Sequence, residues 1–257
     1  MADGTGGAPS TPVVGTGDHK VICLHGWFGS SAGWGWLPEV LDRERFSYAF
    51  PDYRGYGTRR GEPGEYTMSE IAEDTVALAD SLGWDRFSLV GHSMGGMAVQ
   101  RVLVTAPGRV RKLVGVGAVP ASGVPFDERG WALFSGAADD VEKRRMIVAM
   151  TTGGRLSPVW VNQVVRHSLD VADRTAFAAY LEAWANTDFA AEVKGSPVPV
   201  LVVAGEHDPA LGAPVMEETW MRWYPHATLE VMPNAGHYPM FETPVSLATT
   251  VEGFLAT

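Results

Sequence analysis

The sequence predicts an α/β fold: a mostly parallel, twisted sheet with flanking helices and a helical insertion. Short apolar runs rich in β-branched residues alternate with helical patterns along the chain, and a strand, a helix and a second strand in succession form a parallel pair. Between residues 120 and 196 the strand signals disappear and amphipathic segments replace them. With 257 residues, of which 46% are hydrophobic, the chain can bury one large core.

The apolar runs are the expected strands of this sheet. They show no alternation of apolar and polar residues, which is typical of strands buried on both faces. The expected strands cover residues 21–24, 47–50, 87–90, 113–119, 198–204 and 228–232.

Capping signals mark the expected helices between these strands. Thr67 and Glu70 form a capping box, and apolar residues follow them at helical spacing. A second helix is expected over about 214–223. Thr243 caps the last helix, and Pro244 takes its first position, where a missing N–H costs nothing.

These elements divide the chain into an interrupted core. Residues 1–119 form its first part, beginning with a flexible lead-in over 1–18, and residues 197–257 form its second part. Residues 120–196 form a helical cap over one edge of the sheet.

Composition limits the partners and the compartment. The net charge is −10 and the pI is near 5.1, which argues against nucleic acid because its binding needs clustered Lys and Arg. Cys23, in an apolar run, is the only cysteine and is expected to be a buried strand residue. No signal peptide and no apolar run of about 20 residues is visible. We therefore expect a soluble, cytoplasmic protein without a membrane partner.

Two serines share the pattern Gly-x-Ser-x-Gly, and their context separates them. Ser93 directly follows the expected strand 87–90 and precedes a helical stretch over 94–105. A nucleophile elbow requires this position on a tight turn between a strand and a helix. Ser31 lies inside a loop, and no strand precedes its glycine. We therefore predict that Ser93 is the nucleophile and that Ser31 is a turn residue.

A serine nucleophile needs a base, and His237 is the best placed histidine. It lies in the turn-forming segment PNAGHYP after the last expected strand, from which a loop can reach the carboxyl edge of the sheet. His19 in the lead-in and His226 in a polar turn are expected to be solvated, and His167 in the insertion is expected to pack. His92 is expected to make a structural hydrogen bond.

A carboxylate must orient the base, and the segment AGEHDPA after strand 198–204 offers two. We choose Asp208 over Glu206, which is closer to the strand and is expected to be solvated or capping. The order Ser, Asp, His is the one found with a nucleophile elbow. His207 could pair with a carboxylate on a metal, but no His/Cys cluster accompanies it, so no metal site and no cofactor are expected.

Two backbone amides are the expected donors to a tetrahedral oxyanion. One belongs to Met94, which opens the helix after the nucleophile. The other belongs to Trp27 in HGWFG, where Gly26 lets the backbone present its N–H.

Taken together, these segments resemble the α/β-hydrolase superfamily, and in particular its capped branch of serine esterases, lactonases, C–C hydrolases and cofactor-free perhydrolases. The matching pieces are LHGWFGSSAGW, PDYRGYG, LVGHSMGG, PVLVVAGEHD and PNAGHYPMFETP. The resemblance implies the same triad and donors, with residues 120–196 as the cap. Ser93 argues against the dehalogenases and epoxide hydrolases, which carry Asp at this position, and against the dienelactone hydrolases, which carry Cys. Many C–C hydrolases have Asn where this chain has His92.

We therefore predict a serine hydrolase that cleaves carboxylic esters or lactones through an acyl-enzyme. Aromatic residues near the oxyanion loop and in the insertion indicate a small to medium apolar or aromatic substrate. The expected pocket residues are Gly26, Phe28, Trp131 and Trp184. Two alternatives stay open: a C–C bond hydrolase, lyase or perhydrolase with the same triad, and a slowly hydrolysing ligand sensor.

Overall fold

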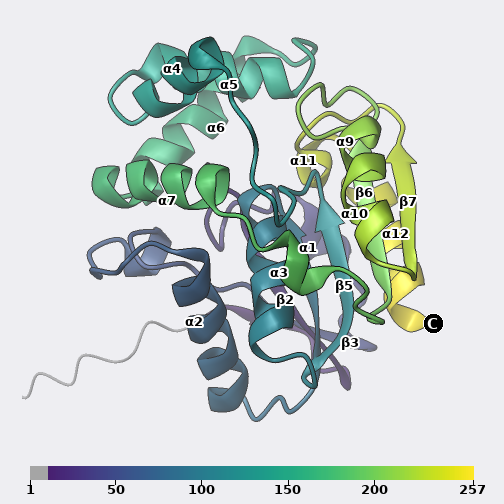
Figure 1. The fold of residues 1–257 in the computed structure, drawn as a ribbon. Coiled ribbons are helices and arrows are strands. Elements are labelled where there is room, and N and C mark those ends of the chain that lie inside the picture. Colours follow the sequence, from purple (N-terminus) through teal and green to yellow (C-terminus); the bar gives the residue numbers. More distant parts are fainter. Residues whose placement is uncertain (1–10) are drawn as a thin grey trace, which may run out of the picture.

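The computed structural model describes residues 11–257, and within them seven strands form one sheet (Figure 1) in the order β1-β3-β2-β4-β5-β6-β7. The strands are β1 (Val13–Val14), β2 (His19–Leu24), β3 (Phe46–Ala49), β4 (Phe87–His92), β5 (Val110–Val116), β6 (Val200–Gly205) and β7 (Ala227–Met232). All neighbours from β3 to β7 pair in parallel, and β1 pairs antiparallel with β3. The predicted α/β class with a mostly parallel sheet is confirmed.

The helices fall into three groups along the chain. Those of the first core segment are α1 (Leu37–Val40), the 3-10 helix η1 (Gly57–Arg59), α2 (Met68–Ser81) and α3 (Met94–Thr105). Between β5 and β6 lie α4 (Glu128–Gly136), α5 (Val141–Thr151), α6 (Pro158–Val171), α7 (Arg174–Asn186) and α8 (Ala190–Val193). The last segment holds α9 (Ala213–Glu218), α10 (Trp220–Trp223), α11 (Pro239–Glu242) and α12 (Pro244–Ala256).

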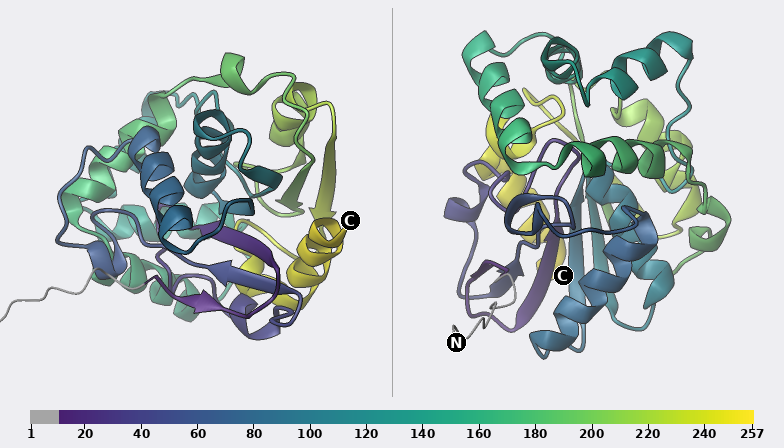
Figure 2. Two further views of the ribbon diagram at one scale, coloured as in Figure 1. Left: turned by 90° about the horizontal axis from the view of Figure 1, so that it is seen from below. Right: turned by 90° about the vertical axis from the view of Figure 1, so that its left-hand side faces the viewer.

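Helices cover both faces of the sheet (Figure 2). On one face α1 packs against α12, and on the other α3 packs between α2 and α8. Helix α10 joins the second group, because the hydroxyl of Tyr224 at its end lies 3.2 Å from Oε1 of Gln100 in α3. This two-sided cover explains why every residue of β4 and β6 is buried.

The beginning of the chain corrects one prediction. Val13 and Val14 pair with Ala49 and Tyr48, so the flexible lead-in expected over 1–18 is wrong from this strand onward. Residues 1–10 lie outside the described part. The short, edge-forming strand has too few residues to show a pattern in the sequence.

Two predicted element ends also shift. The strand expected over 113–119 ends at Val116, because Gly117 takes a positive φ of 48° and turns the chain out of the sheet. The helix expected over 214–223 is broken at Thr219, where ψ is −89°. The N-cap half of the predicted capping box is present, since Thr67 Oγ1 accepts the Glu70 N–H at 3.1 Å. The Glu70 carboxylate accepts the N–H groups of Glu65 and Tyr66 in place of that of Thr67.

Helices α4 to α7 lie over the end of the sheet toward which β5 points (Figure 1). They are tied to the core by the Trp27 indole, which donates to the Phe177 carbonyl at 2.7 Å, and by the Asp173 N–H, which donates to the Gly55 carbonyl at 2.7 Å. Helix α8 packs on α3 of the core instead. Among residues 11–257 no helix combines the length and apolar character that a membrane crossing needs.

Candidate active site

Ser93 occupies a strained turn between β4 and α3. Its φ of 55° and ψ of −119° lie in a region that side chains other than glycine rarely adopt, at a cost of about 1–3 kcal/mol. Hydrogen bonds from both sides hold this conformation: the Ser93 N–H donates to the Val116 carbonyl, and the Val119 N–H donates to the Ser93 carbonyl, both at 3.0 Å. The turn lifts the Ser93 side chain out of the sheet.

Packing requires glycine at position 95, two residues after the serine. A Cβ on Gly95 would lie 2.0 Å from the Leu24 carbonyl oxygen in β2. Helix α3 can therefore start directly above the sheet only with glycine here, which supports the elbow that the sequence predicts.

His237 and Asp208 form a buried hydrogen-bonded pair. His237 Nδ1 lies 2.7 Å from Asp208 Oδ2, and the two residues are only 6% and 5% exposed. Asp208 Oδ1 accepts the N–H groups of Ala210 at 2.9 Å and Leu211 at 3.0 Å. Burial alone would raise the pKa of Asp208, but the charge and hydrogen bond of His237 and these two amides hold the pKa below its usual value.

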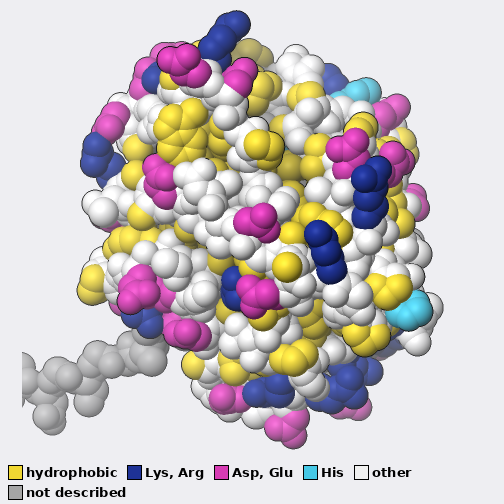
Figure 3. Space-filling view, viewed as in Figure 1, with side chains coloured by type: hydrophobic (Ala, Val, Ile, Leu, Met, Phe, Trp, Pro, Cys, Tyr) yellow, Lys and Arg dark blue, Asp and Glu magenta, His cyan; other side chains and the backbone are white. Residues whose placement is uncertain are grey.

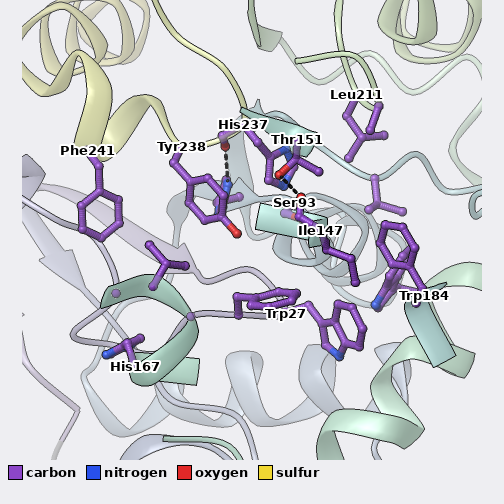
Figure 4. Close-up of a pocket in the computed structure, with 18 of the residues that line it drawn as sticks. Trp27, Ser93, Ile147, Thr151, His167, Trp184, Leu211, His237, Tyr238 and Phe241 are labelled. Carbon is purple, nitrogen blue, oxygen red and sulfur yellow. Dashed lines mark hydrogen bonds between the residues drawn. The ribbon is translucent and has the colours of Figure 1, made fainter. Parts of the chain in front are cut away.

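Ser93 and His237 line the same cavity and lie side by side in its middle (Figure 4). Ser93 Oγ makes no hydrogen bond to any residue in the described range 11–257, and Nδ1 of His237 is taken by Asp208. Nε2 of His237 is therefore the nitrogen that remains for Ser93. The hydrogen bond between a nucleophile and its base is often long or poorly aligned before substrate binds.

Ser31 and Glu206, which were not predicted to be catalytic, form hydrogen bonds with other residues. Ser31 donates its N–H to Asp52 Oδ1 at 2.6 Å and its hydroxyl to Asp52 Oδ2 at 3.0 Å, and it is absent from the cavity lining. Glu206 is half exposed and accepts the Asn234 N–H at 3.0 Å. Both residues are therefore loop supports.

The remaining histidines divide into buried and exposed groups. His19 belongs to β2, with Nε2 2.8 Å from the Ser88 hydroxyl, so the solvated role expected for it in a lead-in is wrong. His226 is exposed as expected. His167 packs with its Nε2 3.1 Å from the Ser30 hydroxyl, but it also lines the cavity.

His92 makes the structural hydrogen bond that the sequence predicts. Its Nε2 donates to the His237 carbonyl at 2.8 Å, so this ring supports the loop that carries His237. Burial, together with the neighbouring His237, lowers the pKa of His92 to about 3. Burial likewise lowers the pKa of His25 to about 4.

These two buried rings predict a steep loss of stability in mild acid. Each ring is neutral in the folded protein but takes up a proton near pH 6.5 in the unfolded chain. The unfolded state therefore binds more protons between about pH 6.5 and pH 4, and stability falls as the pH falls through that window. Together His25 and His92 should reduce the free energy of unfolding by roughly 3 kcal/mol per pH unit there.

Urea unfolding at a series of pH values measures this slope. His92→Asn should lower the slope by about 1.4 kcal/mol per pH unit, while substitution of the exposed His226 by Gln should leave it unchanged. A free energy of unfolding that stays flat from neutral pH to about pH 5 would contradict the neutral state of the buried rings.

The HGW loop lies directly against the elbow. A Cβ on Gly26 would lie 2.8 Å from His92 Nδ1 and 3.0 Å from Ser93 Cβ, so glycine allows this approach. Within residues 11–257, the backbone N–H groups of Trp27 and Met94 have no hydrogen-bond acceptor. Both predicted oxyanion donors therefore carry unpaired N–H groups next to the elbow.

Two tyrosines of the PDYRGYG segment hold this loop in place. The Tyr53 hydroxyl donates to the His25 carbonyl, and the Tyr56 hydroxyl donates to the Trp27 carbonyl, each at 2.8 Å. The Trp27 ring also stacks on Phe177 of α7, with centroids 4.0 Å apart. Contacts from both the core and α7 therefore fix the loop backbone.

The cavity has a volume of about 410 Å³ and extends to both sides of Ser93 (Figure 4). Trp184, Ile147 and Leu211 lie on one side, and His167 and Phe241 lie on the other. Trp184, Ile147 and Leu211 are buried, whereas Trp36, which also lines the cavity, is exposed. Further aromatic lining comes from Phe28, Phe126, Phe134, Trp160 and Tyr238.

Two of the four predicted pocket residues, Phe28 and Trp184, line the cavity. Gly26 does not, because it lies behind the wall against His92 and Ser93. Trp131 on α4 is also absent from the lining, although its ring lies 6.2 Å from that of Phe126, which does line the cavity.

Phe134, one helical turn after Trp131, faces the cavity in its place. Sequence reasoning also missed Ile147, Thr151 and Phe241 as lining residues. Only the position of Phe241 shortly after His237 could have indicated proximity to the site.

Within residues 11–257, no group of three or more His, Cys, Asp or Glu side chains is arranged to hold a metal ion. The polar groups that face the cavity near Ser93 are hydroxyl, imidazole and amide groups. Such groups are suited to proton transfer and to oxyanion stabilisation.

Comparison with known proteins identifies the family. Residues 20–244 match the model of the alpha/beta hydrolase fold, and the chain belongs to this family. It is 27% identical to a pimeloyl-[acyl-carrier protein] methyl ester esterase of Nitrosomonas europaea, over 87% of this chain and 90% of the relative. It is also 27% identical to a 2-hydroxymuconate semialdehyde hydrolase of Pseudomonas putida, over 80% and 75% of the two chains.

Solved structures show the same fold. The esterase EaEST from Exiguobacterium antarcticum superimposes with a TM-score of 0.84 at 20% identity, covering 96% of this chain and 95% of that one. At this identity the likeness concerns the fold alone.

Proposed function

We propose that the protein hydrolyses carboxylic esters or lactones through an acyl-enzyme, with Ser93 as nucleophile, His237 as base and Asp208 as the orienting carboxylate. One observation carries this proposal: the buried His237–Asp208 pair, with 2.7 Å between Nδ1 and Oδ2, lies beside a serine on a strained elbow in a single cavity. This arrangement is the one that activates a serine hydroxyl.

The groups act in two half-reactions. Ser93 Oγ attacks the carbonyl carbon while its proton passes to His237 Nε2, and Asp208 stabilises the resulting imidazolium through Nδ1–H. The tetrahedral intermediate collapses, and the leaving alcohol takes the proton from Nε2. Water then attacks the acyl-enzyme with His237 again as base, which releases the acid and restores Ser93.

The amides of Trp27 and Met94 are the proposed donors to the oxyanion. Their unpaired N–H groups and the contact of Gly26 with Ser93 support this role. Each such donor contributes about a hundred- to thousandfold in rate.

The cavity supports a small to medium apolar or aromatic ester or lactone as substrate. Its volume of about 410 Å³ is within the range of small-molecule pockets, and its walls are mostly aromatic and aliphatic. The esterase from Nitrosomonas europaea supports ester chemistry. A nucleic-acid partner is not proposed, since the net charge is −10 and basic and acidic side chains are interspersed on the face in Figure 3.

A second candidate is hydrolysis of a C–C bond with the same triad. The similarity to a 2-hydroxymuconate semialdehyde hydrolase favours it. Perhydrolysis and slow hydrolysis by a ligand sensor would use the same three residues. The geometry of Ser93, His237 and Asp208 therefore supports them as well.

A panel of substrates separates these chemistries. We expect kcat/KM for p-nitrophenyl butyrate, phenyl acetate or an aryl lactone to exceed that for a vinylogous 1,5-diketone by about a hundredfold or more. Faster cleavage of the diketone would favour C–C hydrolysis, and faster peracid formation from acetate and peroxide would favour perhydrolysis. A single slow turnover on every substrate would favour the sensor.

A further inference from the structure

The connection between α5 and α6, with the sequence TTGGR at residues 151–155, makes contacts that the proposed reaction leaves unexplained. Thr151, the last residue of α5, accepts the backbone N–H of His237 through its carbonyl at 3.1 Å. A helix between β5 and β6 therefore holds the main chain of the proposed base.

Glu242 holds the same loop from the other side. Its Oε2 accepts the N–H of Gly236 at 2.9 Å, and its Oε1 accepts the N–H of Tyr238 at 3.1 Å. These are the two residues that flank His237 in the chain. One carboxylate therefore bridges the backbone on both sides of the base, and its side chain is only 3% exposed.

Arg155 completes this arrangement. Its Nη1 lies 2.9 Å from Glu242 Oε2, and its Nη2 donates to the Asn234 carbonyl at 3.0 Å. A buried carboxylate needs a partner to offset its loss of hydration, and Arg155 is the cation that pairs with it. The guanidinium also bonds the start of the loop directly.

Backbone geometry at two places permits this contact. Gly153 and Gly154 both have positive φ, 69° and 66°, and turn the chain so that Thr151 and Arg155 reach the same loop. A Cβ on Gly236 would lie 2.7 Å from the Cα of Thr152, so the two segments can lie this close only with glycine at position 236.

We infer that Arg155 is a positioning residue for His237, acting through Glu242, so that the α5–α6 connection sets the geometry of the base as well as covering the site. The inference rests on the proposed function, in which His237 is the base. The loop PNAGHYP lies outside helices and strands up to Tyr238, so its shape depends on these hydrogen bonds. A shift of about 1 Å in a catalytic group can cost up to a hundredfold in rate.

Four variants test this inference: Arg155→Met, Arg155→Lys, Glu242→Gln and the double variant Arg155→Met/Glu242→Gln. Arg145→Met is the matched control, because Arg145 also lies in this insertion and pairs with Glu142 and Asn162, away from the loop. The measurements are kcat and KM for p-nitrophenyl butyrate, the rate of inactivation by a fluorophosphonate, and Tm.

For Arg155→Met we expect kcat and the inactivation rate to fall about tenfold, with KM within about twofold of the wild type. Tm should fall below that of Arg145→Met, because Glu242 is left buried without its cation. Arg155→Lys should recover part of kcat. The lysine ammonium can pair with Glu242, but it lacks the two separate nitrogens with which a guanidinium bonds Glu242 and the Asn234 carbonyl together. The double variant should lose less than the product of the two single losses, because Arg155 and Glu242 hold the loop partly through the bond between them.

Wild-type kcat and inactivation rates in Arg155→Met would overturn the inference. A loss of kcat in the double variant equal to the product of the two single losses would overturn it as well. So would a loss of kcat in Arg155→Met that disappears once the rate is corrected for the fraction of folded protein. Failure of the proposed function shows in a different measurement, namely hydrolysis that survives Ser93→Ala with Arg155 intact.

Discussion

Ser93→Ala is expected to lower kcat for ester hydrolysis by about a millionfold and to abolish labelling by a fluorophosphonate probe. The alanine has no oxygen to form the acyl-enzyme, and the rate that remains comes from substrate binding and the oxyanion donors alone. Steady-state kinetics measure the first effect, and gel fluorescence after labelling measures the second.

Ser31→Ala is the matched control for this experiment, because both serines lie in a Gly-x-Ser-x-Gly pentapeptide. The Ser31 hydroxyl donates to Asp52, and the N–H that also donates to Asp52 remains in the variant. We expect full labelling and a stability loss of about 1 kcal/mol. Labelling that persists in Ser93→Ala would remove Ser93 from the mechanism.

Asp208→Asn is expected to lower kcat by about ten thousandfold with little change in KM. The amide has nearly the same shape, but its NH₂ group in place of Oδ2 favours the wrong tautomer of His237, and it cannot stabilise an imidazolium. Kinetics with p-nitrophenyl butyrate, together with Tm to establish folding, measure the effect.

Glu206→Gln is the control for the choice between the two carboxylates of AGEHDPA. Its side chain is half exposed and bonds the Asn234 N–H, which a glutamine oxygen can also accept. We expect kcat within about twofold of the wild type. Equal losses in the two variants would show that the carboxylate at 208 has no special role.

The turn at Ser93 and the approach of His237 to Asp208 could be predicted from the sequence, because these features depend on local signals. A strand that ends in a glycine-flanked serine and continues as a helix has only one compact geometry. The turn residues around His237 and the apolar strand before Asp208 likewise place both groups at the same edge of a parallel sheet. The structure brings His237 and Asp208 to 2.7 Å.

The pocket was predicted less well, because helical periodicity does not tell which apolar face meets which cavity. Trp131 and Phe134 lie on the same helix, and both are aromatic. Phe134 lines the cavity and Trp131 does not, although both rings lie near Phe126. No pattern within α4 distinguishes these two outcomes.

The sequence by itself therefore determined the fold class, the elbow and the choice of candidate triad, since each follows from spacing within one short segment. Only the tertiary structure decided the walls of the cavity, the pairing of Val13 and Val14 with β3, and the bond from Arg155 to Glu242. The last of these joins residues 87 apart in the chain. The packing of helices and strands brings such distant segments together, and local propensity does not determine that packing.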